Sequence, residues 1–375
     1  MTSPTEDLAT AWRAARPAGG LVHLDSAACA RQSAAVLDAV AGHAAREAAE
    51  GGYVAQDRAG LDGTRADLAG MLGRQADDVV FTHSGAEALT TLLAAWPLPP
   101  GAVVACGPGE FGPNLAAFHD RGVGVRVLPT EPCGLVDVGV LASFIHEVRP
   151  ALLHLGHLSS HRGIVQPVAE VAAVCRAQEV PCVVDAAQSL GQADTRIDAA
   201  AIYATSRKWL AGPRGVGVLA VSPELAALLR PHAPSLDEPW WPYPHRLLRL
   251  EAREAHVAGR VGLGVAVREH LALGPARVWH RLAEVGRLTR DVLDGAGGWR
   301  VVEPRDTPSA LTTLRPPPGV DVLATRDRLV AEHGIVTTAC GPERAPLELS
   351  VPVLRVSPHV DVDVAELELL AGALG

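Results

Sequence analysis

The chain has 375 residues, which is long enough for two domains with separate cores. Hydrophobic residues make up 48% and charged residues 20%, a composition that excludes extended disorder. The net charge of −9 without a basic cluster argues against nucleic-acid binding, and no apolar run reaches the roughly 18 residues of a membrane span or forms a leader core. We therefore expect a cytoplasmic protein.

In chain order, amphipathic patterns predict helices over residues 5–16, 31–50 and 168–179, and a long helical stretch over roughly 251–293. Short continuous apolar runs predict strands within 77–89, 101–111, 124–130, 151–160, 180–188, 199–212 and 215–225. Such strands alternating with helices are typical of a mostly parallel sheet that is buried on both faces.

The pattern changes after about residue 230. A connector rich in proline and aromatic residues covers 237–246, and short strand patterns followed by a closing helix fill the end of the chain. We expect an N-terminal arm over 1–20 that packs on the smaller domain, a large domain over 21–245, and a small α+β domain over 246–375.

Lysine use is the most unusual feature of the composition. Lysine and arginine total 33, yet Lys208 is the only lysine. A guanidinium group stays charged at any working pH, whereas a buried amine can lose its proton and become a nucleophile or a base. Codon bias is one explanation of the general preference for arginine, since lysine and arginine are largely exchangeable at exposed positions, but the single amine remains a candidate for chemistry.

Three polar residues follow predicted strands, at the sheet edge where open parallel sheets place their active sites. Ser84 opens a helix whose free N–H groups suit a phosphate, Asp185 ends an apolar run, and Lys208 follows 23 positions later. A carboxylate in such a place requires a cation, although Asp185 alternatively caps the next turn. A phosphate site, an acid and an amine are the groups that pyridoxal phosphate requires.

Several motifs in this order resemble fold-type I pyridoxal-phosphate enzymes of the class V aminotransferase and cysteine desulfurase group. The resemblance implies an α/β fold with a mostly parallel central sheet in the large domain and a smaller α+β C-terminal domain. It also implies pyridoxal 5′-phosphate as the cofactor and a homodimer with shared active sites. The motifs are HLDSAAC (23–29), FTHSGAEAL (81–89), GEFGPN (109–114), SSHRGIVQP (159–167), VVDAAQSLG (183–191), TSRKWLAGPRGVG (205–217) and LRVS (354–357).

The resemblance assigns roles around the cofactor ring. Lys208 would attach to the cofactor, Asp185 would pair with the ring nitrogen, and Gln188 would lie near the ring hydroxyl. Ser160 stands where the family usually has an asparagine near that hydroxyl. Phe111 stands where desulfurases place a histidine over the ring. Because a phenyl ring can stack but cannot transfer protons, Lys208 is expected to be the sole base.

The resemblance also assigns the phosphate end. Ser84, Gly85 and Ala86 would bind through the helix start, by backbone N–H groups because Gly85 and Ala86 replace a threonine pair. Thr205 and Arg207 match the serine and histidine that flank the lysine in desulfurases and bind phosphate.

Arg355 matches the arginine that holds the substrate carboxylate, a role that suits its bidentate geometry. The alternative is a structural surface arginine. In desulfurases, one stretch of the chain contacts the cofactor phosphate bound by the partner subunit. Glu254 replaces a threonine of that stretch, so we expect this contact between subunits to be absent or reworked.

Within this family, GGYVAQD (51–57), TTACGPERAP (337–346) and LRVSPHV (354–360) resemble the pyridoxal-phosphate-dependent C–S lyases of ergothioneine biosynthesis. These enzymes cleave hercynylcysteine sulfoxide and release pyruvate and ammonia. We expect Tyr53 at the substrate. Trp240, Trp241 and Tyr243 form a candidate aromatic cage for its trimethylammonium group, and the alternative is that these rings pack in a domain or subunit interface.

Other interpretations stay open. Cys340 lies near the loop that carries the nucleophile of desulfurases, so sulfur transfer is one alternative, and a buried structural thiol is another. A pyridoxal-phosphate-binding regulator or scaffold without turnover is a third. His154, His157 and His161 are close in sequence but have no acidic partner at ligand spacing, so we expect no metal site.

Overall fold

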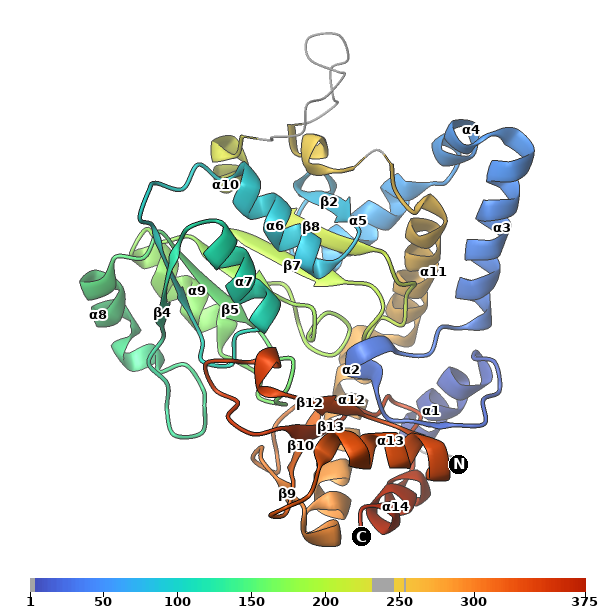
Figure 1. The fold of residues 1–375 in the computed structure, drawn as a ribbon. Helices are drawn as coiled ribbons and strands as arrows, with labels where there is room; N and C mark the ends of the chain where they lie inside the picture. The colour runs from blue at the N-terminus through green and yellow to red at the C-terminus, as the bar shows by residue number, and fades with distance from the viewer. Residues whose placement is uncertain (1–3, 231–245, 253) are drawn as a thin grey trace.

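A seven-stranded sheet forms the centre of the larger part of the molecule (Figure 1). The computed structural model describes residues 4–230, 246–252 and 254–375. The strand order is β2-β8-β7-β6-β5-β3-β4, and within this sheet β8 runs antiparallel to both of its neighbours while the other pairs are parallel. The mostly parallel sheet predicted from the sequence is thus confirmed. The strands are β2 Val79–Thr82, β3 Val103–Cys106, β4 Gly124–Val127, β5 Leu152–Gly156, β6 Cys182–Asp185, β7 Ala201–Thr205 and β8 Gly217–Val221.

Helices cover both faces of this sheet. One core lies between the sheet and the helices α5, α8, α9 and α11, and the other lies between the sheet and α6, α7 and α10. Alternate strand residues enter opposite cores: Val80 and Val183 pack on one side, and Phe81 and Val184 on the other. The helices are α5 Leu61–Leu72, α6 Gly85–Ala95, α7 Gly112–Asp120, α8 Val138–Val148, α9 Val168–Ala177, α10 Pro223–Leu228 and α11 Val257–Leu273.

The stretch predicted as one long helix is two helices. Gly274, with φ of 82°, separates α11 from α12, and Pro275 takes the first position of α12. A left-handed glycine ends a helix readily, and proline suits a first helical turn because its missing N–H is not needed there. α11 packs on α3 and α5, whereas α12 packs on the smaller sheet and α14. The bounds are α3 Ala34–Glu50, α12 Pro275–Leu293 and α14 Val364–Ala373.

The C-terminal part is built on a four-stranded antiparallel sheet of order β12-β13-β10-β9. Its core includes Leu314, Leu354, Trp299 and residues of α12, α13 and α14. The short β1, from the start of the chain, pairs in parallel with β11. The elements are β1 Val22–His23, β9 Arg300–Val301, β10 Thr312–Arg315, α13 Val322–His333, β11 Ile335–Val336, β12 Thr338–Cys340 and β13 Val353–Val356.

The N-terminal helix α1, Pro4–Ala14, joins the two parts. Leu8 and Trp12 are buried in a cluster with Trp209 and Val360, and the Trp12 ring stacks on His359 at 3.9 Å between centroids. The domain boundaries at residues 20 and 245 stay a prediction. The remaining short elements are α2 Ser26–Cys29, α4 Gly52–Asp57, and the 3₁₀ turns η1 Ala76–Asp78, η2 Arg246–Leu250, η3 Ala296–Gly298 and η4 Pro342–Arg344.

In the described ranges, each helix is too short or too polar to cross a bilayer.

Candidate active site

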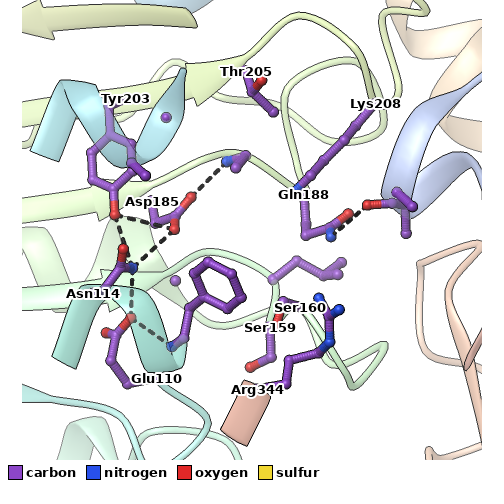
Figure 2. A pocket seen from close by; sticks show the side chains of 18 of the residues that line it. Glu110, Asn114, Ser159, Ser160, Asp185, Gln188, Tyr203, Thr205, Lys208 and Arg344 are labelled. Carbon is purple, nitrogen blue, oxygen red and sulfur yellow. Dashed lines mark hydrogen bonds between the residues drawn. The ribbon is translucent and has the colours of Figure 1, made fainter. Parts of the chain in front are cut away.

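A cavity of about 220 Å³ opens where the parallel strands of the large sheet end and α6 begins (Figure 2). We call it the site cavity. Eleven residues predicted from the sequence line it, together with further residues such as Glu110, Tyr203 and Arg344. They are Ser84, Gly85, Ala86, Phe111, Ser160, Asp185, Gln188, Thr205, Arg207, Lys208 and Arg355.

Asp185 ends β6, and its carboxylate receives three hydrogen bonds. Oδ1 accepts from the backbone N–H of Ala187 at 2.8 Å, whereas Oδ2 accepts from the Tyr203 hydroxyl at 3.1 Å and from Asn114 Nδ2 at 3.3 Å. The alternative that Asp185 caps the next turn therefore holds for Oδ1 only. The other oxygen takes part in a side-chain network, and the carboxylate faces the cavity.

Lys208 lies in the loop after β7, and its amine extends toward the cavity (Figure 2). Burial lowers its pKa to about 7, and the positive charges of Arg207, Arg355 and Arg344 act in the same direction, while Asp185 opposes them. A substantial fraction of the amine is therefore neutral near pH 7. This is the form that attacks a carbonyl group or accepts a proton.

The start of α6 forms one end of the cavity. Ser84 Oγ accepts from the backbone N–H of Glu87 at 3.0 Å, so the side chain caps the helix. The N–H groups of Gly85 and Ala86 precede the first helical hydrogen bond, and both residues line the cavity. Thr205 and Arg207 line it as well, so N–H groups, a hydroxyl and a guanidinium are available to an anion such as phosphate.

Two polar side chains and one ring line the cavity beside Lys208. Ser160 Oγ is buried and has no hydrogen-bond partner within the described part of the chain. Gln188 is held by a bond from its Nε2 to the Ala27 carbonyl at 3.0 Å and by a bond from Trp209 Nε1 to its Oε1 at 3.0 Å. Phe111 lies at the start of α7. The unpartnered hydroxyl fits a ligand that carries an oxygen at this position.

Arg355 reaches the cavity from β13 and is only 1% exposed, so the surface-arginine alternative is wrong. Its Nη1 donates to the Ser160 carbonyl at 2.6 Å and its Nη2 to Asp25 at 3.0 Å. Arg344, which the sequence did not suggest, lines the same wall, and its guanidinium lies 5.9 Å from the centroid of the Phe111 ring. The two arginines give this wall a positive charge that suits a carboxylate.

Some predicted residues lie elsewhere. Tyr53 does not line the cavity; its side chain is 72% exposed and its hydroxyl lies 3.3 Å from the Glu254 carboxylate. The candidate aromatic cage of Trp240, Trp241 and Tyr243 lies outside the described residues.

Cys340 is fully buried in β12 and does not line the cavity. Burial raises the pKa of its thiol even though Arg355 and Arg344 attract a thiolate. Such a thiol is a poor nucleophile.

The three clustered histidines have separate surroundings. His154 contacts Glu110 and Tyr203, His161 contacts Glu348, and burial lowers the pKa of His157 to about 4. Across the described ranges, no group of three or more candidate ligands is arranged to hold a metal ion.

Sequence reasoning missed Glu110, Asn114 and Tyr203, which line the cavity next to Asp185, and also Arg344. Glu110 and Asn114 stand in the GEFGPN motif, which was a usable signal. Tyr203 shares a strand face with Thr205 because side chains two apart on a strand point the same way. Arg344 stands in the TTACGPERAP motif (337–346), but no family role pointed to it, and the fold brings it to the cavity from another part of the chain.

Comparisons with known proteins agree with this geometry. The family model described as aminotransferase class-V matches residues 22–370. The chain is 51% identical to a probable hercynylcysteine sulfoxide lyase from Mycobacterium tuberculosis (strain CDC 1551 / Oshkosh), over 99% of this chain and 94% of that protein.

Solved structures share the fold. A cysteine desulfurase from Escherichia coli superimposes with a TM-score of 0.84 at 24% identity, covering 100% of this chain and 98% of that chain. A cystine C–S lyase in complex with cysteine persulfide gives a TM-score of 0.85 at 18% identity, covering 95% of this chain and 97% of that chain. The α/β fold predicted from the sequence is therefore confirmed.

Proposed function

This chain belongs to the class V aminotransferase family, and we propose that it is a pyridoxal-phosphate-dependent lyase that cleaves the C–S bond of hercynylcysteine sulfoxide. The products are pyruvate, ammonia and the sulfenic acid of ergothioneine, and the reduction of this sulfenic acid to ergothioneine is a separate step that needs an external two-electron reductant. The observation that carries the substrate assignment is the 51% identity to a probable hercynylcysteine sulfoxide lyase over nearly the full length of both proteins.

The site cavity has the donor set that the cofactor requires. Lys208 offers an amine whose pKa is lowered to about 7, and Asp185 offers a carboxylate oxygen for the ring nitrogen. The start of α6 with Thr205 and Arg207 suits the phosphate, and the unpartnered hydroxyl of Ser160 suits the ring oxygen. Bound there, pyridoxal phosphate supplies an electron-accepting ring that stabilises negative charge at the substrate α-carbon.

The chain's own residues then do two things. Arg355 and Arg344 hold the substrate α-carboxylate, which places the α-carbon near the amine of Lys208. The neutral Lys208 amine takes the α-proton. The C–S bond breaks as the sulfur leaves with its bonding electrons, and water hydrolyses the three-carbon fragment to pyruvate and ammonia.

This reaction requires no protein thiol, and the buried Cys340 supports that reading. A desulfurase, in contrast, needs an accessible thiolate to receive sulfur. We therefore propose elimination rather than sulfur transfer to Cys340.

The experiment offers hercynylcysteine sulfoxide, cysteine and alanine to the purified holoenzyme and identifies the products. We expect pyruvate and ammonia from the sulfoxide, in equal amounts, in both the wild type and Cys340→Ala. Persulfide on Cys340 together with alanine from free cysteine would instead favour a desulfurase. A cofactor absorption band that changes with none of these compounds would favour a binding protein without turnover.

We also propose a cytoplasmic homodimer with shared active sites, as the family resemblance implies. The exposure of Tyr53 and Glu254, both predicted to lie near substrate or partner, is compatible with a covering subunit. Light scattering on the purified protein is expected to give twice the chain mass, and a monomer with full activity would contradict the shared site.

The aromatic cage stays part of the proposal. If Trp241 and Tyr243 hold the trimethylammonium group, Trp241→Ala and Tyr243→Ala raise the KM for the betaine substrate. The KM for a cysteine conjugate that lacks the trimethylammonium group serves as the control. An unchanged KM for the betaine in both variants contradicts the cage.

A further inference from the structure

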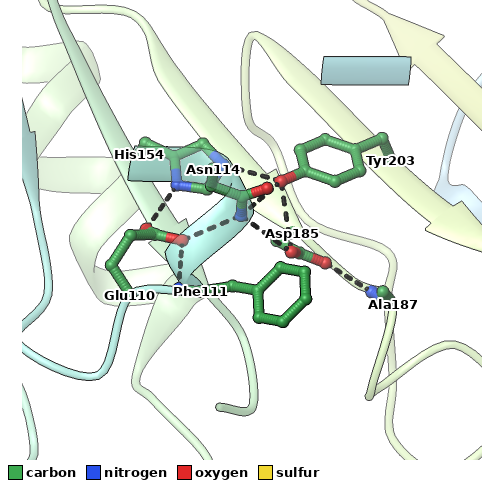
Figure 3. A network of polar contacts seen from close by, with 7 residues as sticks. All are labelled: Glu110, Phe111, Asn114, His154, Asp185, Ala187 and Tyr203. Atoms are coloured by element: carbon green, nitrogen blue, oxygen red, sulfur yellow. Dashed lines mark hydrogen bonds and ion pairs between the residues drawn. The ribbon is translucent and has the colours of Figure 1, made fainter. Parts of the chain in front are cut away.

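A hydrogen-bonded chain of buried polar side chains extends from Asp185 through Tyr203 and His154 to Glu110 (Figure 3). Of these, His154 does not line the site cavity, whereas Glu110 and Tyr203 also reach its wall. His154 Nδ1 lies 2.7 Å from Glu110 Oε2, and His154 Nε2 lies 2.9 Å from the Tyr203 hydroxyl. The Tyr203 hydroxyl in turn lies 3.1 Å from Asp185 Oδ2. Asn114 Nδ2 lies beside the chain, 2.8 Å from Glu110 Oε1 and 3.1 Å from the Tyr203 hydroxyl.

Because the side chains of this hydrogen-bond chain are buried, the position of each proton decides which group donates and which accepts. His154 is 0%, Tyr203 1% and Glu110 5% exposed, so these groups must satisfy one another. A tyrosine hydroxyl has one proton to donate. If Tyr203 donates to Asp185, it must accept from His154, and His154 Nε2 then carries a proton. His154 Nδ1 faces a carboxylate, so it needs a proton as well.

The surroundings of His154 favour this doubly protonated form. Burial alone disfavours a charged imidazole, but the adjacent charge and hydrogen bond of Glu110, with the charge of Asp185, raise the pKa of His154 overall. On the neighbouring strand β3, burial and Glu110 raise the pKa of the Cys106 thiol, which keeps it neutral. From α7, Phe118 presents its ring edge-on at 5.3 Å and adds no charge.

We propose that Glu110 and protonated His154 form a charged pair that fixes the direction of this hydrogen-bond chain, so that Tyr203 donates to Asp185 and holds its carboxylate toward the ring nitrogen of the cofactor. His154 and Tyr203 are positioning residues, since they act through Asp185. The inference rests on the proposed function only for the identity of the cofactor.

The opposite direction has a distinct consequence. A neutral His154 with its proton on Nδ1 would turn a bare Nε2 toward Tyr203, and the tyrosine would then donate to His154. Asp185 would lose one of its three donors. Asn114 cannot compensate fully, because the two protons of its amide are already shared among Glu110, Asp185 and the Tyr203 oxygen.

The first test uses the cofactor-free protein. Nitrogen-15 NMR of the histidine side chains, with the His154 signals assigned by their loss in His154→Gln, reports whether both ring nitrogens carry protons. We expect both to stay protonated at pH values above the ordinary histidine pKa of about 6.5. Loss of one proton near or below that ordinary value would overturn the inference, whatever the cofactor.

The second test uses Tyr203→Phe, which removes one oxygen and keeps the ring that fills the core. Losing a hydrogen bond to a charged group is expected to weaken pyridoxal phosphate binding by roughly 10- to 100-fold. With nitrogen-15 in the cofactor ring, the ring nitrogen of the variant is expected to lose its proton at lower pH than in the wild type. Thr289→Val, which removes a buried hydroxyl from α12, is the matched control. It should change neither the cofactor affinity nor the titration of the ring nitrogen.

The outcomes separate the two proposals. Suppose that the wild type binds the cofactor and that Tyr203→Phe has the same cofactor affinity and the same titration of the ring nitrogen. The proposed direction of the hydrogen-bond chain is then wrong, while the proposed function stands. If the wild type does not bind the cofactor at Lys208, the proposed function fails, and the NMR of His154 still decides the state of the charged pair.

Discussion

The amine of Lys208 lies among three guanidinium groups and one nearby carboxylate, and this balance sets its chemistry. Desolvation and the positive charges of Arg207, Arg355 and Arg344 lower its pKa to about 7 against the attraction of Asp185. Arginine cannot take this role because its guanidinium keeps its proton. At the residue scale, the single lysine of the sequence is therefore a tuned group rather than a relic of codon use.

The rate of cofactor attachment tests this tuning. Because only the neutral amine attacks an aldehyde, the rate at which the cofactor-free protein binds pyridoxal phosphate should rise with pH, with a midpoint near the lowered pKa of about 7. Stopped-flow absorbance at a series of pH values measures this rate. A rate that keeps rising toward the ordinary lysine pKa of about 10.4 would contradict the lowered value.

Ser160→Ala tests the unpartnered hydroxyl. Because Ser160 Oγ has no partner within the described residues, its removal should leave the melting temperature of the cofactor-free protein unchanged or raised. Affinity for the cofactor should fall by roughly tenfold, as expected for one lost hydrogen bond. Thr312→Val removes another buried hydroxyl that has no partner in the described part of the chain and does not line the cavity, and it should leave the affinity unchanged. A lower melting temperature with unchanged affinity would show that Ser160 is purely structural.

The elements that carry the site were predictable to different degrees. The strands of the large sheet are continuous apolar runs, so their places and mostly parallel arrangement followed from the sequence. The two-residue pair of β1 and β11 joins segments more than 300 positions apart and has no local signal. The helix break was visible at Gly274 and Pro275, but helical periodicity on both sides outweighed it.

The same contrast holds for the site. Residues within motifs, such as Asp185 and Lys208, were identified because their neighbours in the sequence resemble a family. The link from Glu110 through His154 to Tyr203 depends on which strands are adjacent in space. Sequence spacing instead grouped His154 with two histidines whose partners differ from its own.

Strand β8 packs closely against the start of α6, and adding a methyl group at this contact tests how much the packing contributes. A Cβ at Gly217 would lie 2.5 Å from the backbone carbon of Ser84, so Gly217→Ala forces the strand and the helix start apart. We expect a loss of about 1–3 kcal/mol in the free energy of unfolding, and weaker binding of the cofactor phosphate. Urea unfolding and cofactor titration measure the two effects.

Gly63→Ala is the control, since a Cβ on this α5 residue meets nothing within 4 Å. Alanine there should keep or raise stability because it favours the helix. Equal unfolding free energies and equal cofactor affinities in the two variants would contradict the close packing at Gly217.

At the scale of the whole molecule, buried neutral histidines set the response to acid. His270 on α11 is 2% exposed, and burial lowers its pKa to about 4. In the unfolded chain its pKa is about 6.5, so the unfolded state binds the extra proton first as the pH falls. Stability is therefore lost between about pH 6.5 and 4, at up to roughly 1.4 kcal/mol per pH unit for this group.

His270→Leu removes that contribution. Between about pH 7 and 5, the variant should lose about 2 kcal/mol less unfolding free energy than the wild type, as measured by urea denaturation at each pH. His119→Gln, at a side chain that is 90% exposed, should keep the wild-type pH dependence. An unchanged pH dependence in His270→Leu would show that this histidine is not held neutral in the folded protein.

The fold brings a lysine from one strand end, an acid from the next, a helix start and an arginine wall from the C-terminal sheet to one cavity. The most direct measurement of this arrangement is pyruvate release from hercynylcysteine sulfoxide by the wild type and by Lys208→Arg, both supplied with excess pyridoxal phosphate. Lys208→Arg keeps the positive charge and removes the only lysine amine, so we predict pyruvate from the wild type and none above background from the variant. Pyruvate release by Lys208→Arg at the wild-type rate would contradict the account.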